Sequence, residues 1–256
     1  MRTLNDNELD IIVENYRQPF VSGEIKSAIA KPLIAFKDFP IVQRGEITLT
    51  FGGTKTRRSA FNNLLASIAL GFKAPGFGTN PNDQNLRVLL IDTNHSRNDS
   101  IRMLSFISKR VGNRVDDCSC YNLSAKKASV EFVKAILKKA ESEGKPFDIV
   151  ILDEVGDFSD NGHENIWQFA ADLWAIAKRS QCAFIATAYD SWWPDPKNPQ
   201  KVFWPGEALY KSANAIIQLT LNSKHLTELK YISCFGDYLS LPTAIGNDES
   251  GLPVFI

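Results

Sequence analysis

From residue 46 onward, short apolar runs alternate with longer stretches of helical spacing. Five runs have the length and the β-branched or aromatic content of buried strands, at 46–51, 87–92, 148–153, 183–188 and 215–221. The stretches with apolar residues three and four positions apart are 59–70, 100–111, 125–143 and 164–179. This alternation predicts an α/β fold with a central, mostly parallel sheet flanked by helices on both faces.

Local signals predict where two of these helices begin and end. Asp99 is expected to cap the helix at 100–111, and Ser124 is expected to cap the helix at 125–143. Gly144 and Pro146 then end the second helix.

The two ends of the chain differ from this pattern. Residues 5–16 are amphipathic and lead into a connecting stretch, so 1–40 is predicted to be an N-terminal arm and 41–256 the main domain. Residues 228–256 alternate apolar and polar positions between turn signals, which predicts a C-terminal β-hairpin at one edge of the sheet.

Composition limits the classes of protein that fit. The 29 basic and 29 acidic residues balance, so a nucleic-acid contact requires a local basic patch. No apolar stretch approaches the roughly 20 residues that cross a bilayer, and we expect a cytoplasmic protein with no membrane contact. The four cysteines are expected to be reduced thiols, because neither His163 nor His225 has metal-ligand spacing to Cys118 and Cys120.

The segment at 52–59 follows a predicted strand and precedes a predicted helix, as a phosphate-binding P-loop does. Such loops read G-x-x-x-x-G-K-[ST]: backbone N–H groups cradle phosphates, Lys reaches their oxygens, and Ser or Thr binds magnesium. The first Gly and the final Ser are present here, but Arg57 replaces the second Gly and Arg58 replaces the Lys. The candidate nucleotide-binding residues are Gly52, Gly53, Thr54, Lys55, Thr56, Arg57, Arg58 and Ser59.

Two carboxylates follow the predicted strand at 148–153. Asp153 stands where a Walker B aspartate holds Mg²⁺ together with Ser59, and Glu154 could polarise an attacking water as the catalytic residue. The alternative is a buried strand that ends in a solvated acidic turn.

With these segments in place, the chain resembles RecA-like P-loop ATPases, most closely the RepA/DnaB-like proteins of plasmids and mobile elements. The resemblance covers about 40–256 and rests on 44–52, 88–97, 148–154 and the ending at 251–253. It implies a RecA-like fold and ATP with Mg²⁺ at the carboxyl ends of the strands. It also implies a homo-oligomer, often a ring, or a partner in mobile-element replication.

Several positions depart from that family's pattern. Asn94 stands where RecA-like enzymes place a catalytic Glu, and Tyr189 stands where relatives carry a Gln sensor of the γ-phosphate. His95 could replace the base, although an adjacent His is more often a surface residue. Residues 231–256 contain no Lys or Arg to act in a neighbouring active site, which leaves Lys224 and Lys230.

An aromatic segment at 191–205 follows the fourth predicted strand, where the RecA family has a DNA-binding loop. Its tryptophans and lysines suit base stacking and phosphate neutralisation on single-stranded DNA: Trp192, Trp193, Lys197, Lys201 and Trp204. The alternative is a rigid, proline-rich loop that packs on its own domain or on a neighbour.

These observations support three hypotheses. The first is a RecA-like nucleotide-binding protein of mobile-element DNA replication or mobilisation, with weak or lost ATP hydrolysis. The second is an active ring-forming ATPase or helicase that acts on single-stranded DNA. The third is a non-catalytic DNA-binding or scaffold protein that retains the P-loop only as a turn.

Overall fold

A computed structural model describes residues 32–256 except 38, 84, 124–127, 159–162, 192, 196–197, 205 and 234–237. It gives no side-chain description at 163–165, 193–195, 198–203, 233 and 238–239. Residues 32–256 form one compact unit. That unit includes 32–40, which the sequence assigned to the N-terminal arm, whereas 1–31 lie outside the described residues.

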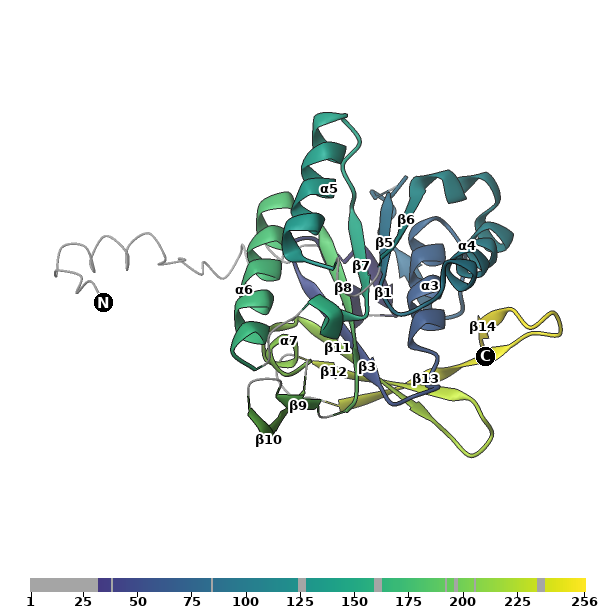
Figure 1. Cartoon of the computed structure of the whole chain (residues 1–256). Helices are drawn as coiled ribbons and strands as arrows, with labels where there is room; N and C mark the ends of the chain where they lie inside the picture. Colours follow the sequence, from purple (N-terminus) through teal and green to yellow (C-terminus); the bar gives the residue numbers. More distant parts are fainter. Residues whose placement is uncertain are drawn as a thin grey trace, which may run out of the picture. The chain divides into compact units, whose positions relative to one another are not determined.

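A nine-stranded mixed sheet forms the centre of this unit (Figure 1). Its order is β14-β13-β12-β11-β3-β8-β7-β5-β6. The parallel part consists of β3 (Ile47–Gly52), β5 (Val88–Asp92), β6 (Cys118–Asn122), β7 (Ile149–Asp153), β8 (Ala183–Tyr189) and β11 (Ala215–Leu221). The antiparallel strands β12 (Thr227–Ser233), β13 (Tyr238–Asn247) and β14 (Pro253–Phe255) extend it beyond β11.

Helices cover the parallel strands on both faces, because alternate strand residues on each face are apolar. Helices α5 (Val130–Ser142), α6 (His163–Ser180) and α7 (Glu207–Ser212) pack on the face formed by residues such as Leu49 and Leu152. Helices α3 (Arg58–Ala69) and α4 (Arg97–Val111) pack on the opposite face, against residues such as Leu90 and Ile151. The expected α/β architecture is therefore present.

Short elements complete the fold. Strands β1 (Ile34–Phe36), β2 (Phe39–Val42) and β4 (Phe77–Thr79) form a small antiparallel sheet on the α3 side. Strands β9 (Trp193–Asp195) and β10 (Asn198–Phe203) pair with each other after β8. The 3₁₀ helices η1 (Gly112–Asp117) and η3 (Val155–Phe158) follow α4 and β7.

Two predicted helix starts were wrong. Helix α4 begins at Arg97, where Ser96 is the cap, because its side chain accepts a hydrogen bond from the Asp99 backbone N–H. Helix α5 begins at Val130 and is capped by Ser129, five residues after the predicted Ser124, which lies outside the described residues.

Strand pairing also differs at both edges of the sheet. The sequence did not predict β6, since the short run Cys-Ser-Cys-Tyr-Asn has little apolar content. At the other edge, the predicted hairpin is present as the antiparallel pair β12 and β13, and β14 adds a third antiparallel strand to it.

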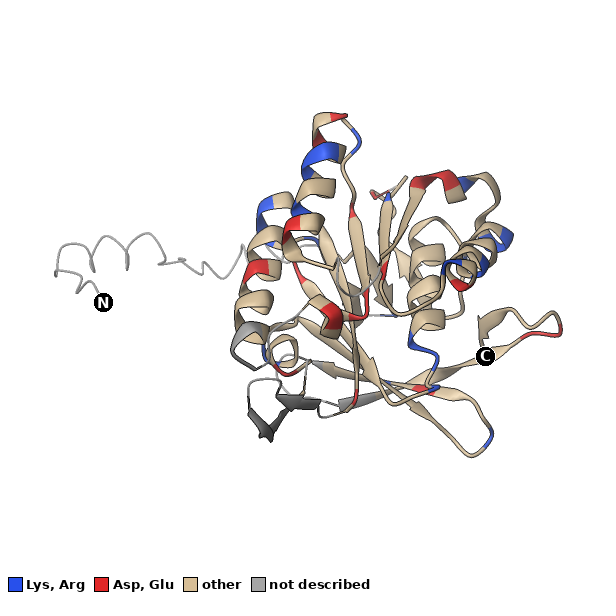
Figure 2. Ribbon diagram, in the orientation of Figure 1, with Lys and Arg blue, Asp and Glu red and all other residues tan. Residues whose placement is uncertain are grey.

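Charged residues lie mainly on the helices, whereas the central strands carry charge chiefly at their ends (Figure 2). In the described part of the chain, no helix is both long enough and apolar enough to cross a membrane.

Gly52 has no room for a side chain where β3 meets β11. A Cβ atom there would lie 2.5 Å from the Leu219 carbonyl oxygen and 2.6 Å from the Thr56 hydroxyl, whereas one at Gly53 would meet nothing within 4 Å. We therefore predict that Gly52→Ala lowers the free energy of unfolding by about 1–3 kcal/mol, as overpacking does. Urea denaturation should show Gly53→Ala within about 0.5 kcal/mol of the wild type; equal losses for the two variants would contradict this account.

Candidate functional site

The carboxyl ends of four parallel strands meet at one edge of the sheet. In register, Tyr189 pairs with Gly52, Asp153 with Thr187, and Asp92 with Asp153. The chain leaves β3 toward α3 on one face and leaves β8 toward α7 on the other. A crevice is expected between adjacent strands whose connections diverge in this way, and ligands of open α/β sheets bind there.

The loop at 53–57 lies at this edge of the sheet, between β3 and α3. Thr56 closes it on itself, since its hydroxyl donates a hydrogen bond to the Gly53 carbonyl at 2.8 Å. Thr54 and Lys55 are exposed, whereas Thr56 is buried. The predicted loop is therefore a compact turn that leads directly into the first turn of α3.

Arg57 has a backbone conformation that favours glycine. It has φ 56° and ψ 35°, in the left-handed region that disfavours residues with a Cβ atom. Its guanidinium compensates by donating hydrogen bonds to the carbonyls of His225, at 2.7 Å, and Ile245, at 3.1 Å. Arg57 thus anchors the loop to the C-terminal strands.

Arg58 points into the protein. Its side chain is 6% exposed, and Nη1 lies 3.1 Å from Glu154 Oε2. The guanidinium carbon lies 3.4 Å from the centre of the Tyr189 ring. Arg58, which the sequence analysis compared with a phosphate-binding lysine, is therefore held by a buried carboxyl group and an aromatic face.

Glu154 is fixed from several sides. Its Oε1 accepts hydrogen bonds from the backbone N–H groups of Gly156 and Tyr189, at 3.2 and 3.3 Å. Burial raises the pKa of Glu154 to about 8; the nearby Asp153 also raises it, and Arg58 acts against both. Desolvation prevails because the side chain is only 3% exposed and has one cation beside it.

Asp153 and Ser59 come together as predicted for a magnesium pair. Ser59 hydrogen-bonds the Asp153 carboxyl group, and burial raises the pKa of Asp153. The other notable feature is Asp153 Oδ1, which is buried and has no hydrogen-bond partner. A buried carboxylate oxygen without a partner is costly unless a cation or ordered water satisfies it.

A second carboxylate, Asp92, organises the neighbouring strand end. It accepts hydrogen bonds from the backbone N–H groups of Asn94 and His95, both at 3.1 Å, and from the Ser100 hydroxyl. Burial opposes its ionisation, but the hydrogen bonds from His95 and Ser100 prevail and lower the pKa of Asp92.

His95 is oriented by this carboxylate. Its Nδ1 lies 3.0 Å from Asp92 Oδ1, which raises the pKa of His95, and its Nε2 lies 3.4 Å from the Ser59 hydroxyl. Asn94 is exposed and lies 3.4 Å from the Tyr189 hydroxyl. His95 is therefore directed toward the loop, and Asn94 toward the end of β8.

The aromatic segment is only partly described. Trp192 and Lys197 lie outside the described residues, and the side chains of Trp193 and Lys201 are not described. Trp204 is half-buried: its indole N–H donates to the Tyr189 carbonyl at 2.6 Å, and its ring lies 5.3 Å from that of Phe51. The packing alternative accounts for these contacts of Trp204.

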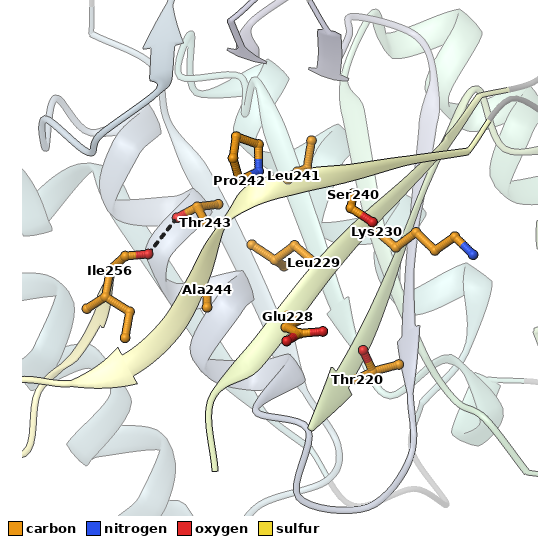
Figure 3. A pocket seen from close by; sticks show the side chains of 10 residues that line it. All are labelled: Thr220, Glu228, Leu229, Lys230, Ser240, Leu241, Pro242, Thr243, Ala244 and Ile256. Atoms are coloured by element: carbon orange, nitrogen blue, oxygen red, sulfur yellow. Dashed lines mark hydrogen bonds between the residues drawn. The ribbon is translucent and has the colours of Figure 1, made fainter. Parts of the chain in front are cut away.

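The two lysines considered as cations for a neighbouring subunit lie on the C-terminal strands and their turn. Lys224 is exposed in the turn between β11 and β12. Lys230 lines a hollow of about 410 Å³ on β11, β12 and β13, where Ser240 lies opposite it in register (Figure 3). None of the residues that line this hollow belongs to the loop or the carboxylate cluster.

Sequence reasoning missed two polar residues of the site. Asp92 and Thr93 both lie in the segment 88–97 that carries the family resemblance, but neither was given a role. The Thr93 hydroxyl accepts from the Glu154 N–H at 3.0 Å and lies 3.3 Å from the Asp153 carbonyl, so it joins β5 to β7. The sequence did contain a signal for these two residues. An Asp-Thr pair follows the apolar run at 88–91, as the Asp-Glu pair follows the apolar run at 149–152.

No protein-family model matches the chain, and no curated protein is significantly similar to it. Among the described residues, no group of three or more His, Cys, Asp or Glu side chains is arranged to hold a metal ion. A magnesium site of the P-loop type needs only a hydroxyl and one carboxylate from the protein, as the Ser59 and Asp153 pair offers.

We predict that the anchoring role of Arg57 shows in the ranking of its variants. Arg57→Ala keeps the unfavourable φ and loses two hydrogen bonds to carbonyls, which should lower the free energy of unfolding by about 1–2 kcal/mol. Arg57→Gly should lose less, because glycine tolerates this φ. Lys55, at φ 66° and exposed, is the matched control, and Lys55→Gly should be neutral or stabilising in urea denaturation. If Arg57→Gly raised the free energy of unfolding as much as Lys55→Gly does, the Arg57 side chain would not anchor the loop.

The raised pKa of Glu154 predicts a specific dependence of stability on pH. Between about pH 4.5 and 8 the folded state keeps the proton that the unfolded state has released, so the free energy of unfolding should fall as pH rises through this window. Glu154→Gln should remove this component. In urea denaturation, the free energy of unfolding of the variant should therefore fall less between pH 5 and pH 8 than that of the wild type. An identical pH dependence in both proteins would show that Glu154 does not titrate there.

Proposed function

We propose that the chain is a RecA-like nucleotide-binding protein of mobile-element DNA replication or mobilisation, and that it binds ATP but hydrolyses it slowly or not at all. Residues 52–59 would hold the phosphates. The proposal combines the family resemblance of the sequence with the convergence of the loop, Asp153 and Glu154 at the carboxyl ends of the strands.

The contact that carries the proposal is Arg58 between Glu154 and Tyr189. Arg58 is the cation closest in sequence to the helix start, where phosphates bind. To reach a phosphate, its guanidinium has to leave a carboxyl group at 3.1 Å and a ring at 3.4 Å. Nucleotide binding would therefore exchange the Glu154 carboxyl group, as a partner of Arg58, for a phosphate.

The residues present fit a magnesium ion. Ser59 supplies a hydroxyl oxygen at the start of α3, and Asp153 supplies a buried oxygen that has no hydrogen-bond partner. Hard oxygen ligands of this kind suit Mg²⁺, which commonly keeps several waters and the oxygens of a substrate phosphate. When bound, the ion would neutralise phosphate charge.

Part of a nucleotide would lie in a hollow beside the loop. A hollow of about 230 Å³ lies against α3 and α4 and is bordered by His95. It combines apolar groups with polar ones: Ala60, Asn63, Asp99, Arg102, Met103, Phe106 and Pro253. Mostly apolar walls with a few polar groups are typical of small-molecule sites.

Slow hydrolysis follows from the same contacts. Glu154 is the carboxyl group that we expect to accept a proton from water, but it accepts two backbone hydrogen bonds and faces Arg58. Asn94, beyond β5, is a carboxamide and cannot accept a proton at neutral pH. A general base is worth roughly 10²- to 10⁴-fold in rate, so its loss is sufficient to make turnover slow.

We predict that substitutions at Arg58 separate binding from turnover. With ATP and Mg²⁺, the wild type should bind in isothermal titration calorimetry and show little phosphate release, with or without single-stranded DNA. Arg58→Ala should weaken ATP binding by roughly 10- to 100-fold, because one charge-assisted hydrogen bond is worth about 1.5–3 kcal/mol. Arg58→Lys should keep binding and increase phosphate release, because a compact ammonium fits a tight phosphate cradle better than a planar fork.

The matched control is Lys139→Ala, which replaces an exposed lysine on α5, outside 52–59, and should bind ATP within a few-fold of the wild type. ATP binding that is unchanged in Arg58→Ala would place the phosphates elsewhere. Rapid, DNA-stimulated turnover by the wild type would instead favour the active ATPase or helicase, and absence of ATP binding would favour the scaffold protein.

A further inference from the structure

Strand β6 forms one edge of the large sheet (Figure 1). Within the described part of the chain it pairs only with β5, from Val88 with Cys118 to Asp92 with Asn122. The Leu123 N–H donates a hydrogen bond to the Asp92 carbonyl, so Leu123 and every second residue before it direct their backbone N–H and C=O groups toward β5. The backbone groups of the residues between them, Cys118, Cys120 and Asn122, point away from β5.

The sequence of β6 lacks the features that protect edge strands. Native edges carry charged residues, proline or bulges, or are very short. Cys-Ser-Cys-Tyr-Asn contains neither charge nor proline, and its pairing with β5 has no register shift. The opposite edge, β14, has only three residues and begins with Pro253. The β6 edge is therefore the one suited to pairing.

Apolar side chains border this edge on both faces of the sheet. Ile101, on α4, is 55% exposed, and Tyr121, in β6, is 39% exposed. Tyr121 packs edge-on against Phe132 of α5, on the opposite face from α4. On the α4 face, Ile101, Leu104 and Cys120 line a hollow of about 350 Å³. An added strand would thus find apolar contacts above and below the sheet.

Charges at the two ends of β6 indicate what adds there. Asp116, just before β6, is exposed, and Arg97, also exposed, lines the hollow beside Asn122 at the other end of the strand. In an antiparallel pair of identical strands, the start of one lies beside the end of the other. Asp116 of one copy then faces Arg97 of the other, and two-fold symmetry repeats the contact.

We infer that β6 pairs with β6 of a second copy in antiparallel orientation, which joins two nine-stranded sheets across a two-fold axis. Complete overlap of the five-residue strands places Cys120 opposite its own copy and Cys118 opposite Asn122. This pairing uses all three outward-facing residues, and it covers Ile101 and Tyr121. It is independent of any nucleotide.

Sedimentation velocity of the full chain over a range of concentrations tests this pairing. The wild type should form a dimer, and Cys120→Pro should weaken it about tenfold or more, because proline removes an outward N–H without touching the bonds to β5. Asp116→Arg and Arg97→Asp should each weaken the dimer, and the double variant should recover most of the wild-type affinity. Circular dichroism checks that each variant is folded.

Mild oxidation with diamide gives a second measurement that does not depend on the proline variant. A disulfide between the two copies of Cys120 should appear as a covalent dimer on non-reducing gels. It should persist in Cys118→Ser and disappear in Cys120→Ser. A chain that is monomeric at all concentrations would overturn the inference, as would a larger assembly insensitive to the charge exchange and without the Cys120 cross-link.

Discussion

The buried contact between Arg58 and Glu154 is the interaction on which the organisation of the site depends. It joins the start of α3 to the end of β7, and the Tyr189 ring extends it to the end of β8. Breaking such a pair by removing one partner leaves an uncompensated polar group in a dry environment, which costs several kcal/mol. The start of α3 and the ends of β7 and β8 are therefore held together by one side chain, which under the proposed function would have to move to bind a phosphate.

These contacts show what Arg57 and Arg58, which differ from the Gly and Lys of the P-loop pattern, do in this structure. A lysine is a compact point charge, whereas the planar guanidinium of arginine can bond a carboxyl group at its edge and stack on a ring at its face. Arg58 does both at once. Arg57 is also used by the fold, since its side chain bonds two carbonyls of the C-terminal strands. Both arginines are thus integrated into the protein by contacts that glycine and lysine could not make.

The hydrophobic pattern of the sequence was sufficient to predict the strands and helices that are long and strongly apolar. The five buried strands and four main helices are all present, because their periodicity follows from burial on one or two faces of the sheet. Strand β6 was missed because an edge strand buries too little to require apolar residues. Ser96 and Ser129 were missed as caps because several serines and aspartates precede each helix, and only the backbone decides which of them accepts the bond.

Within the site, the convergence of the loop with Asp153 and Glu154 was predictable from strand ends, whereas the partners of the side chains were not. A side chain such as Arg58 has several directions open to it, and the choice depends on Glu154 and Tyr189, which lie about 100 residues or more away.

The anchoring of Arg57 to the carbonyls of His225 and Ile245 has an evolutionary consequence. The loop and the turn between β11 and β12 cannot vary independently. A shift of those carbonyls would remove the hydrogen bonds that compensate for the unfavourable φ of Arg57. Substitutions in the two regions should be epistatic, with effects that do not add. A change to glycine at this position is then easy only in a background where the C-terminal strands have already changed.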